Sequence, residues 1–214
     1  MKAGASHIGI GYNTRVVYCL ISLCVISSFL FSQPQQNIDP NGYNKFYYDN
    51  GKVSSEGKMR DGKPDGYWKT YSPNGKIKSE GNRKEYQLDS SWKFYDGEGK
   101  IISEIKYLKG KKEGARTTWE AGKYIISEEL YSADIKQGAS LVYYHPDDSA
   151  QTKGGIKSKT TFDKGKENGT AYEYDKKGNI ITIWEYNYGV LKRQEQINRV
   201  DKAGEKQGVW KDFF

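Results

Sequence analysis

The residues able to perform acid–base, nucleophilic or metal chemistry are few in this chain of 214 residues. Its two histidines are His7, near the amino terminus, and His145, in the sequence His145-Pro146-Asp147-Asp148. An imidazole beside two carboxylates could hold a metal ion weakly, but one histidine with adjacent acids is more typical of a polar loop. A Ser-His-Asp arrangement would need His145 as its base, and no G-x-S-x-G sequence presents a serine to it. We therefore expect no enzyme activity, no catalytic residues and no metal site.

Both cysteines, Cys19 and Cys24, lie within an apolar segment near the amino terminus. From Val16 to Phe31 this segment has 16 consecutive uncharged residues, which suits the central region of a signal peptide and falls short of the roughly 20 residues of a membrane-spanning helix. The sequence therefore predicts that residues 1–32 form a hydrophobic helix that is removed as a signal peptide. An uncleaved anchor is the alternative.

The predicted leader implies export to the periplasm, the outer envelope or the outside of the cell. Once the leader is cleaved no cysteine remains, which excludes a disulfide, a zinc–thiolate site and a thiol nucleophile. We expect residues 33–41 to be a linker and residues 42–214 to form the structured part of the chain.

Charged residues are numerous and interleaved, with 34 Lys and Arg against 27 Asp and Glu. Interleaving of this kind is typical of a solvated surface, and we expect neither a nucleic-acid partner nor a cofactor. The densest basic cluster extends from Lys109 to Arg116 and includes Lys111 and Lys112. It could bind an anionic membrane or glycan, although a solvated turn is the simpler explanation. Four equally spaced acids are predicted to be solvated partners of neighbouring lysines: Glu56, Glu80, Glu104 and Glu128.

The sequence repeats itself with a period of 24 residues. Units begin at Gly42, Gly66, Ser90, Gly114 and Gly138, and later units begin at Gly169 and Gly208. The sixth residue of every unit is aromatic: Tyr47, Tyr71, Tyr95, Trp119, Tyr143, Tyr174 and Phe213. A β-branched residue follows in the first six units, once a seven-residue insertion around Asp147–Gly154 is allowed: Val53, Ile77, Ile101, Ile125, Ile156 and Ile180.

Each unit is predicted to be a β-hairpin. One turn is formed by pairs that permit the positive φ of a tight turn, as in Asn74-Gly75, and the other contains Gly-Lys, as in Gly62-Lys63. The Gly-Lys pairs are turn residues, because no G-x-x-x-x-G-K-[ST] phosphate loop is present. A unit of 24 residues is too short for a helical crossover, so successive strands must be antiparallel neighbours. The sequence therefore predicts an all-β fold, an elongated, single-layer, twisted antiparallel sheet of about a dozen strands.

Aromatic side chains are the candidate binding residues of this sheet, because they could stack on sugars or bases. A structural ladder is the better explanation for a ring that recurs in every unit. The candidate binding residues are these rings and the basic cluster: Tyr47, Trp68, Tyr71, Trp92, Tyr95, Trp119, Tyr143, Lys109, Lys111 and Lys112.

The motif G-x-W-x-x-Y-x-x-N-G-K-[IV]-x-x-E, complete over Gly66–Glu80 (GYWKTYSPNGKIKSE), resembles the bacterial variant of the MORN repeat. The resemblance extends over about Gly42 to Phe214. It implies stacked hairpins without catalytic residues, and binding to proteins or lipid head groups. Proteins of this kind are often described as antitoxin components of toxin–antitoxin modules. The chain departs from the motif at Ser90, which replaces the starting glycine, at Tyr86-Gln87, which replace Gly-Lys, and at the shortened turn Glu120–Lys123.

These observations predict a non-catalytic binding or scaffold protein whose partner is another protein. The partner would dock on the sheet face or on a free terminal strand, Gly208–Phe214, since an unpaired edge invites strand addition. Two alternatives remain open at this point, which are an antitoxin or immunity protein and a protein that binds anionic lipid or glycan.

Overall fold

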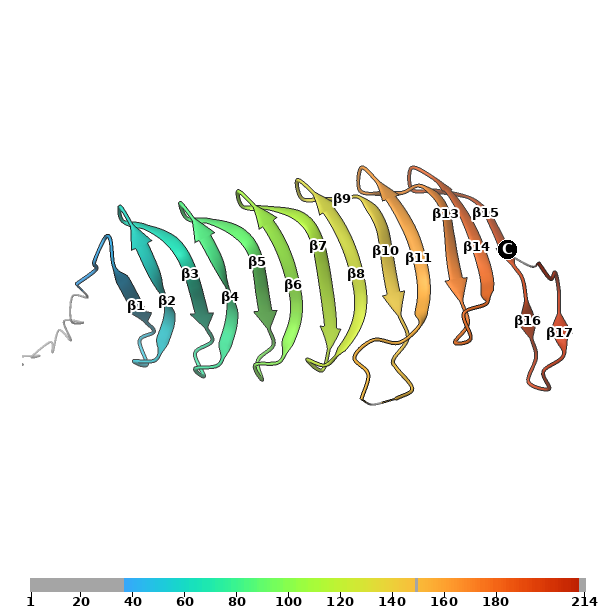
Figure 1. The fold of residues 1–214 in the computed structure, drawn as a ribbon, viewed down its shortest axis with the longest axis horizontal. Coiled ribbons are helices and arrows are strands. Elements are labelled where there is room, and N and C mark those ends of the chain that lie inside the picture. Colours follow the sequence, from blue (N-terminus) through green and yellow to red (C-terminus); the bar gives the residue numbers. More distant parts are fainter. Residues whose placement is uncertain (1–36, 149, 212–214) are drawn as a thin grey trace, which may run out of the picture. The chain divides into compact units, whose positions relative to one another are not determined.

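The computed structural model describes residues 37–148 and 150–211 of the chain. The predicted signal peptide, residues 33–36 of the predicted linker and Phe213 lie outside the described residues. Every regular element within the described ranges is a β-strand, which confirms the all-β prediction (Figure 1).

Among the residues that the structure describes, no helix has the length and apolar character needed to span a membrane.

The strands follow one another along the chain with short connections. They are β1 (Tyr43–Tyr47), β2 (Val53–Arg60), β3 (Lys63–Tyr71), β4 (Ile77–Lys84), β5 (Gln87–Tyr95), β6 (Ile101–Leu108), β7 (Lys111–Glu120), β8 (Tyr124–Ser132), β9 (Ile135–Lys136), β10 (Gly138–Tyr143), β11 (Ile156–Asp163), β12 (Lys166–Glu167), β13 (Gly169–Tyr174), β14 (Ile180–Asn187), β15 (Val190–Gln196), β16 (Arg199–Val200) and β17 (Lys206–Gln207).

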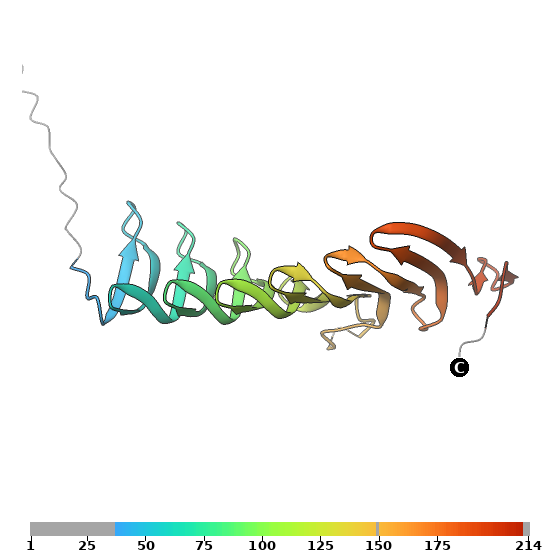
Figure 2. The same ribbon diagram turned by 90° about the horizontal axis from the view of Figure 1, so that it is seen from above.

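Fifteen of these strands form one antiparallel sheet whose spatial order is the order of the sequence, from β1 to β15. The short strands β9 and β12 pair with β8 and β11 at one edge of this sheet. Figures 1 and 2 show the hairpins in a single row, with no second layer among the described residues. The predicted sheet of stacked hairpins is therefore confirmed. The predicted insertion lies in the long loop between β10 and β11, which is closed by the Tyr144 N–H donating to the Gly155 carbonyl over 2.9 Å.

Six two-residue connections at the top of Figure 1, here called the upper turns, share one backbone conformation. Both residues of each have positive φ, as expected for type I′ hairpin turns: Asp61–Gly62, Glu85–Tyr86, Lys109–Gly110, Ala133–Asp134, Lys164–Gly165 and Tyr188–Gly189. The second residue of each later turn donates its N–H to a carbonyl of the preceding unit, as Gly110 does to Leu88 (2.9 Å). In the first turn Gly62 donates to Pro40, just before the first unit (2.9 Å). Neighbouring hairpins are therefore joined at their turns as well as along their strands.

The predicted aromatic and β-branched columns pair with each other at the opposite edge of the sheet. Tyr71 lies opposite Ile77 and Tyr95 opposite Ile101, in each case beside a register shift in the ladder. The same pairing recurs in the other four hairpins: Tyr47 with Val53, Trp119 with Ile125, Tyr143 with Ile156 and Tyr174 with Ile180. A repeated bulge accounts for this arrangement, since an extra residue in one strand shifts the register by one.

The two faces of the sheet carry different side chains, because successive residues of a strand point to opposite sides. One face, here called the tryptophan face, contains a row in which Asn44, Gly57, Trp68, Gly81, Trp92 and Ile105 lie opposite one another. Trp92 is 1% exposed, and its indole N–H donates to the Asn82 carbonyl over 2.6 Å. The ring packs directly against Gly81, where an added Cβ would lie 2.6 Å from two of its atoms. This face holds most of the buried core.

Ser90 is strained in a way that the equivalent glycines are not. The first residue of later units adopts positive φ, at 100° for Gly66 and 95° for Gly114, and Ser90 is held at 59°. A side chain with a Cβ disfavours this region, so Ser90→Gly should raise the free energy of unfolding by about 1 kcal/mol. Urea denaturation would measure the change. Ser158→Gly, in strand β11, should have the opposite sign, since it removes a side chain from an extended residue. A loss at both positions would contradict this explanation.

The carboxyl-terminal part of the described chain differs from the prediction. We expected a free strand of the main sheet to begin at Gly208, but β16 and β17 form a separate two-stranded ribbon. Residues 208–211 are not an antiparallel strand, and Val209 instead makes an isolated parallel bridge with Ile197. The open edge of the main sheet at this end is therefore β15.

Candidate functional site

The second face of the sheet, here called the ladder face, carries lysine and glutamate on successive strands. In one row they alternate across six strands: Lys45, Glu56, Lys69, Glu80, Lys93 and Glu104. The Lys45 ammonium lies 3.2 Å from the Glu56 carboxylate, and Lys69 lies 4.0 Å from Glu80. Cross-strand pairs of opposite charge stabilise a sheet modestly, so this row contributes to the array as well as to its surface.

Tyrosine hydroxyls also donate hydrogen bonds to glutamates of this column. The Tyr71 hydroxyl donates to Glu56 and the Tyr95 hydroxyl donates to Glu80, both over 2.5 Å, and Tyr143 donates to Glu128 in the same way. Each tyrosine reaches back 15 residues to the preceding hairpin. The lysine partners predicted for these acids are present at Glu56 and Glu80, but the two carboxylates are not simply solvated, because their side chains are only 14% and 16% exposed. The aromatic column therefore links successive repeats through its hydroxyls.

Tyr71 should make the stability of the sheet depend on acid pH. Its hydroxyl, against opposing burial and with help from Lys45, holds the pKa of the Glu56 carboxyl below its ordinary 4.5. A carboxyl with a lowered pKa adds stability above its unfolded pKa, and this stability is lost as pH falls below about 4.5. Tyr71→Phe should therefore lower the free energy of unfolding near neutral pH by about 1–2 kcal/mol and by less at pH 3. Urea denaturation at both pH values would measure this, and an equal loss at both would contradict it.

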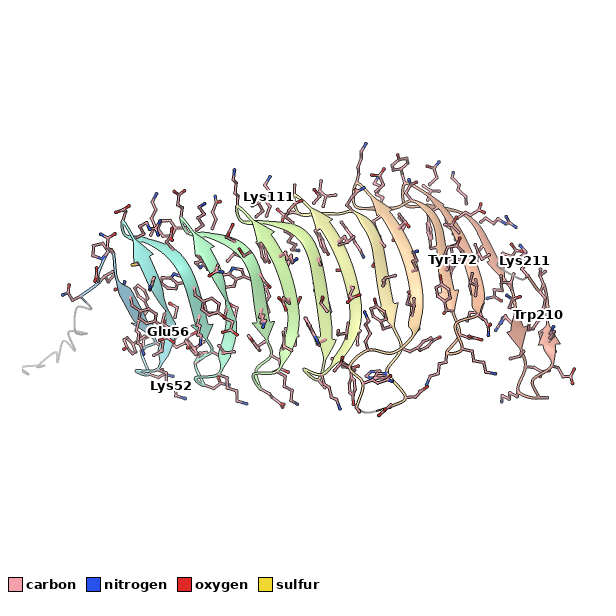
Figure 3. All side chains as sticks on the ribbon, viewed as in Figure 1. Lys52, Glu56, Lys111, Tyr172, Trp210 and Lys211 are labelled. Carbon is pink, nitrogen blue, oxygen red and sulfur yellow. The ribbon has the colours of Figure 1, made fainter. Side chains whose placement is uncertain are left out.

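Three tyrosines lie exposed on the ladder face at the start of the sheet. Tyr43 and Tyr47 are each 54% exposed and Tyr67 is 49% exposed. Lys45 lies between the first two in β1, and Glu56, opposite Lys45, is labelled in Figure 3. The Tyr67 pKa is raised to about 12 by partial burial and by the hydrogen bond to Glu80, so its hydroxyl stays protonated. We call Tyr43, Lys45, Tyr47 and Tyr67 the tyrosine patch.

Only some of the rings predicted to bind a ligand are exposed to solvent. Trp68 and Trp92 are buried at 4% and 1% exposure on the tryptophan face, and Tyr143 is buried at 7%, so none of the three presents its ring to a ligand. The partly exposed rings are Tyr71, Tyr95 and Trp119, and the exposed one is Tyr47.

The basic cluster lies at one of the upper turns, far along the sequence from the tyrosine patch. Lys109 and Lys111 are exposed, and Lys111 is labelled in Figure 3. Lys112 is half-buried, with its ammonium 5.0 Å from the centre of the Tyr131 ring. The structure therefore brings the lysines of this cluster together but separates them from the predicted rings.

Sequence reasoning missed Tyr43 and Tyr67. Both are the second residue of their unit, directly after Gly42 and Gly66, and this shared position is the signal that identifies them. Position two precedes the lysine of the ladder by two residues, so an aromatic ring there must lie on the ladder face.

His145 lies in the long loop, where its Nε2 contacts the Glu120 carboxylate and its ring meets Tyr124 edge-on at 5.1 Å. Within the described ranges no group of three or more His, Cys, Asp or Glu side chains is placed to hold a metal ion. One open hollow has a volume of about 890 Å³. It lies between the turn after β13 and the segment that includes Trp210 and Lys211.

Comparison with known protein families supports the repeat. The model of the MORN repeat variant matches residues 40–61, 64–85 and 88–109, three segments that begin 24 residues apart. No curated protein matches the chain. MORN repeats are generally non-catalytic and commonly mediate binding to proteins or membrane lipids. The hairpins from β1 to the upper turn after β6 thus match three repeats of the MORN variant, and the sheet continues the same architecture to β15.

Proposed function

We propose that this chain is a non-catalytic binding protein that docks a protein partner on its ladder face, at the tyrosine patch. The observation that carries this proposal is the exposure of Tyr43, Tyr47 and Tyr67, about half of each, on one face beside Lys45. Tyrosine offers a large contact area and a polar hydroxyl at low cost in conformational entropy, and it is enriched in protein interfaces.

Two further features favour recognition of a protein over a small molecule. The tyrosine patch extends over β1 and β3 with the glutamates of the ladder beside it, so it offers rings and both signs of charge over a broad surface. None of its residues lines the hollows beside the turn after β13, beside the long loop or over β7, β8 and β10, whereas small ligands bind in concave sites. If the leader directs export, as the sequence predicts, the partner is met in the cell envelope or outside the cell.

Crosslinking in the native cell, followed by mass spectrometry, tests this proposal. The triple variant Tyr43→Ser, Tyr47→Ser and Tyr67→Ser should reduce recovery of the crosslinked partner at least about tenfold. The matched control replaces Tyr86 and Tyr188 by serine, since these residues are 54% and 49% exposed but lie at upper turns. Equal recovery with both variants would overturn the assignment of the site, and repeated failure to capture any protein with the wild-type chain would overturn the partner class.

A toxin is one specific kind of partner that this face could bind, as an antitoxin or immunity protein would require. Co-expression with a toxin encoded beside this gene should then protect cells, and the triple tyrosine variant should lose that protection. Absence of protection by the wild-type chain would remove this version of the proposal and leave the general one untouched.

A second candidate function, binding to an anionic surface, is favoured by lysines that recur at the upper turns. The exposed ones lie along one edge of the sheet: Lys63, Lys84, Lys109, Lys111, Lys164 and Lys166. Lysines near an anionic membrane each contribute about 1 kcal/mol. Acidic residues in the same turns, such as Asp61 and Glu85, oppose this attraction.

Vesicles that contain phosphatidylserine test the second candidate. Replacing Lys109, Lys111 and Lys112 by glutamate should weaken vesicle binding at least about tenfold. The control changes Lys52, Lys76 and Lys100 to glutamate, which gives the same change of charge at the opposite edge of the sheet. Binding that resists high salt and the first set of changes would overturn the electrostatic version of this function.

A further inference from the structure

Strand β15 is the last strand of the main sheet, and one side of it is open. The Ile197 N–H donates to the Ile181 carbonyl over 2.9 Å, so residue 197 points its backbone toward the preceding strand. Backbone groups alternate in direction along an antiparallel strand. Gln194 and Gln196, which lie opposite Trp184 and Thr182, therefore point their N–H and C=O groups away from β14. No described strand pairs with this side of β15.

The lower end of the same edge is covered by residues 208–211, here called the cap. The Asn198 N–H donates to the Val209 carbonyl over 2.8 Å. The Asn198 side chain holds the cap at a second point, since its Oδ1 accepts from the Lys211 N–H (2.7 Å) and its Nδ2 donates to the Lys211 carbonyl (2.9 Å). Lys211 also places its ammonium 2.7 Å from the Glu195 carboxylate. Figure 3 labels Trp210 and Lys211 in this segment.

The residue that the cap joins, Ile197, is apolar and lies directly after β15. Ile197, which the cap contacts through its bridge with Val209, is completely buried, at 0% exposure. The cap is thus joined, backbone to backbone, to a buried apolar residue at the end of an open strand. Open, apolar strand edges favour pairing with another chain, and proteins commonly cover them with a loop.

We propose that the open edge of β15 is a self-association surface, which pairs with β15 of a second copy of this chain when the cap is released. The cap and the second copy compete for one place, because a strand added along β15 would continue past Ile197, where Val209 now lies. This inference does not depend on the partner proposed for the tyrosine patch, which is at the opposite end of the sheet.

The side chains of β15 are complementary to themselves under a two-fold axis. Antiparallel pairing centred on Gln194 places the Arg193 of each copy directly opposite the Glu195 of the other. The two residues form a close cross-strand pair on one face of the joined sheet, and no like charges lie opposite each other on that face. In the capped chain the Glu195 carboxylate is held by Lys211 and by its own Arg193, both at 2.7 Å. Release of the cap removes the Lys211 contact and leaves this carboxylate available to the Arg193 of the second copy.

The test compares the oligomeric state of full-length variants by sedimentation over a range of concentrations. Asn198→Ala together with Lys211→Ala removes the side-chain contacts of the cap and should lower the dimer dissociation constant at least about tenfold relative to the wild type. The matched control, Lys100→Ala, removes an exposed ion pair with Glu98 in the turn before β6 and should leave the oligomeric state unchanged. An unchanged dissociation constant in the cap variant would overturn the proposal.

A third substitution identifies the surface that pairs. Proline at an edge position removes only an N–H that points outward, so Gln194→Pro should leave the β14–β15 pairing intact. Added to the cap variant, it should restore the monomer. A dimer that persists with Gln194→Pro would show association through another surface and would overturn the assignment to the β15 edge. Circular dichroism of each variant checks that the sheet is retained.

Discussion

Replacing Trp92 by alanine is expected to lower the free energy of unfolding by about 3–5 kcal/mol, the largest loss that we predict for a single substitution in this chain. The ring is 1% exposed, and its indole N–H is bonded to the Asn82 carbonyl at 2.6 Å. A single-layer sheet has little other buried apolar surface, so the neighbouring side chains cannot close over the cavity that alanine leaves. Urea denaturation followed by circular dichroism would measure the loss.

The control for this prediction is Trp210→Ala, the same change at a ring that is 40% exposed. Its ring is covered on one side by the Lys206 ammonium at 4.2 Å, so the expected loss is less than about 1 kcal/mol. Because each repeat contacts only its neighbours, the Trp92 variant should also show faster hydrogen exchange in β4 to β6 before it does elsewhere. Equal losses for the two tryptophans would contradict the assignment of Trp92 to the core.

Gly81→Ala is expected to cost about 1–3 kcal/mol, although it adds a single methyl group to an extended strand. A Cβ at this position would lie 2.6 Å from two atoms of the Trp92 ring and 2.7 Å from the Ser91 carbonyl oxygen. The ring is fixed by its bond to Asn82 and the carbonyl belongs to the next strand of the sheet, so neither can move away cheaply. The variant should unfold at a lower urea concentration than the wild type.

Gly97→Ala is the matched control, because this glycine lies in a turn where an added Cβ would meet no atom within 4 Å, and it lacks the left-handed φ of other turn glycines. Its effect should stay within about 0.5 kcal/mol, and a small gain is expected because alanine restricts the unfolded chain. A loss at Gly97 as large as the loss at Gly81 would mean that the Trp92 contact is not the cause.

The repeated arrangement of Gly57 with Trp68 and Gly81 with Trp92 ends in the middle of the sheet. Strand β7 has Arg116 at the place of the tryptophan, opposite Ile105, and its guanidinium lies 3.4 Å from Glu129. Lys136 joins the same carboxylate at 2.8 Å. The array thus keeps its backbone geometry while exchanging an aromatic core for a charged one, and the matched family segments end before β7.

Much of this fold could be predicted from sequence, because the repeat is short. A period of 24 residues leaves room for two strands and two turns, and turn residues such as Asn74-Gly75 fix where the strands end. The alignment of Tyr71 with Ile77, and of the equivalent pairs in the other hairpins, follows from that period. At Ser90 the fold imposes positive φ even without glycine, so the position in the repeat decides the backbone conformation there.

The exposure of each ring was decided by the tertiary structure. Alternation along a strand places Trp68 and Tyr67 on opposite faces, but the sequence does not say which face is closed. Trp68 lies across Gly57 of the preceding strand and is buried, whereas Tyr67 remains half exposed beside the lysine ladder. The predicted binding set therefore included two core tryptophans and omitted two exposed tyrosines.

The sequence by itself determined the repeat, the hairpins and their order, since local turn chemistry and a fixed period leave no other topology. The tertiary structure decided which side chains are available and how the last strand is covered. Glu56 is bound by a tyrosine 15 residues later in the chain, and the edge of β15 is covered by Lys211 and its neighbours from beyond an intervening ribbon. Both contacts join segments whose distance in space depends on strand pairing and register, and these are set only when the hairpins stack.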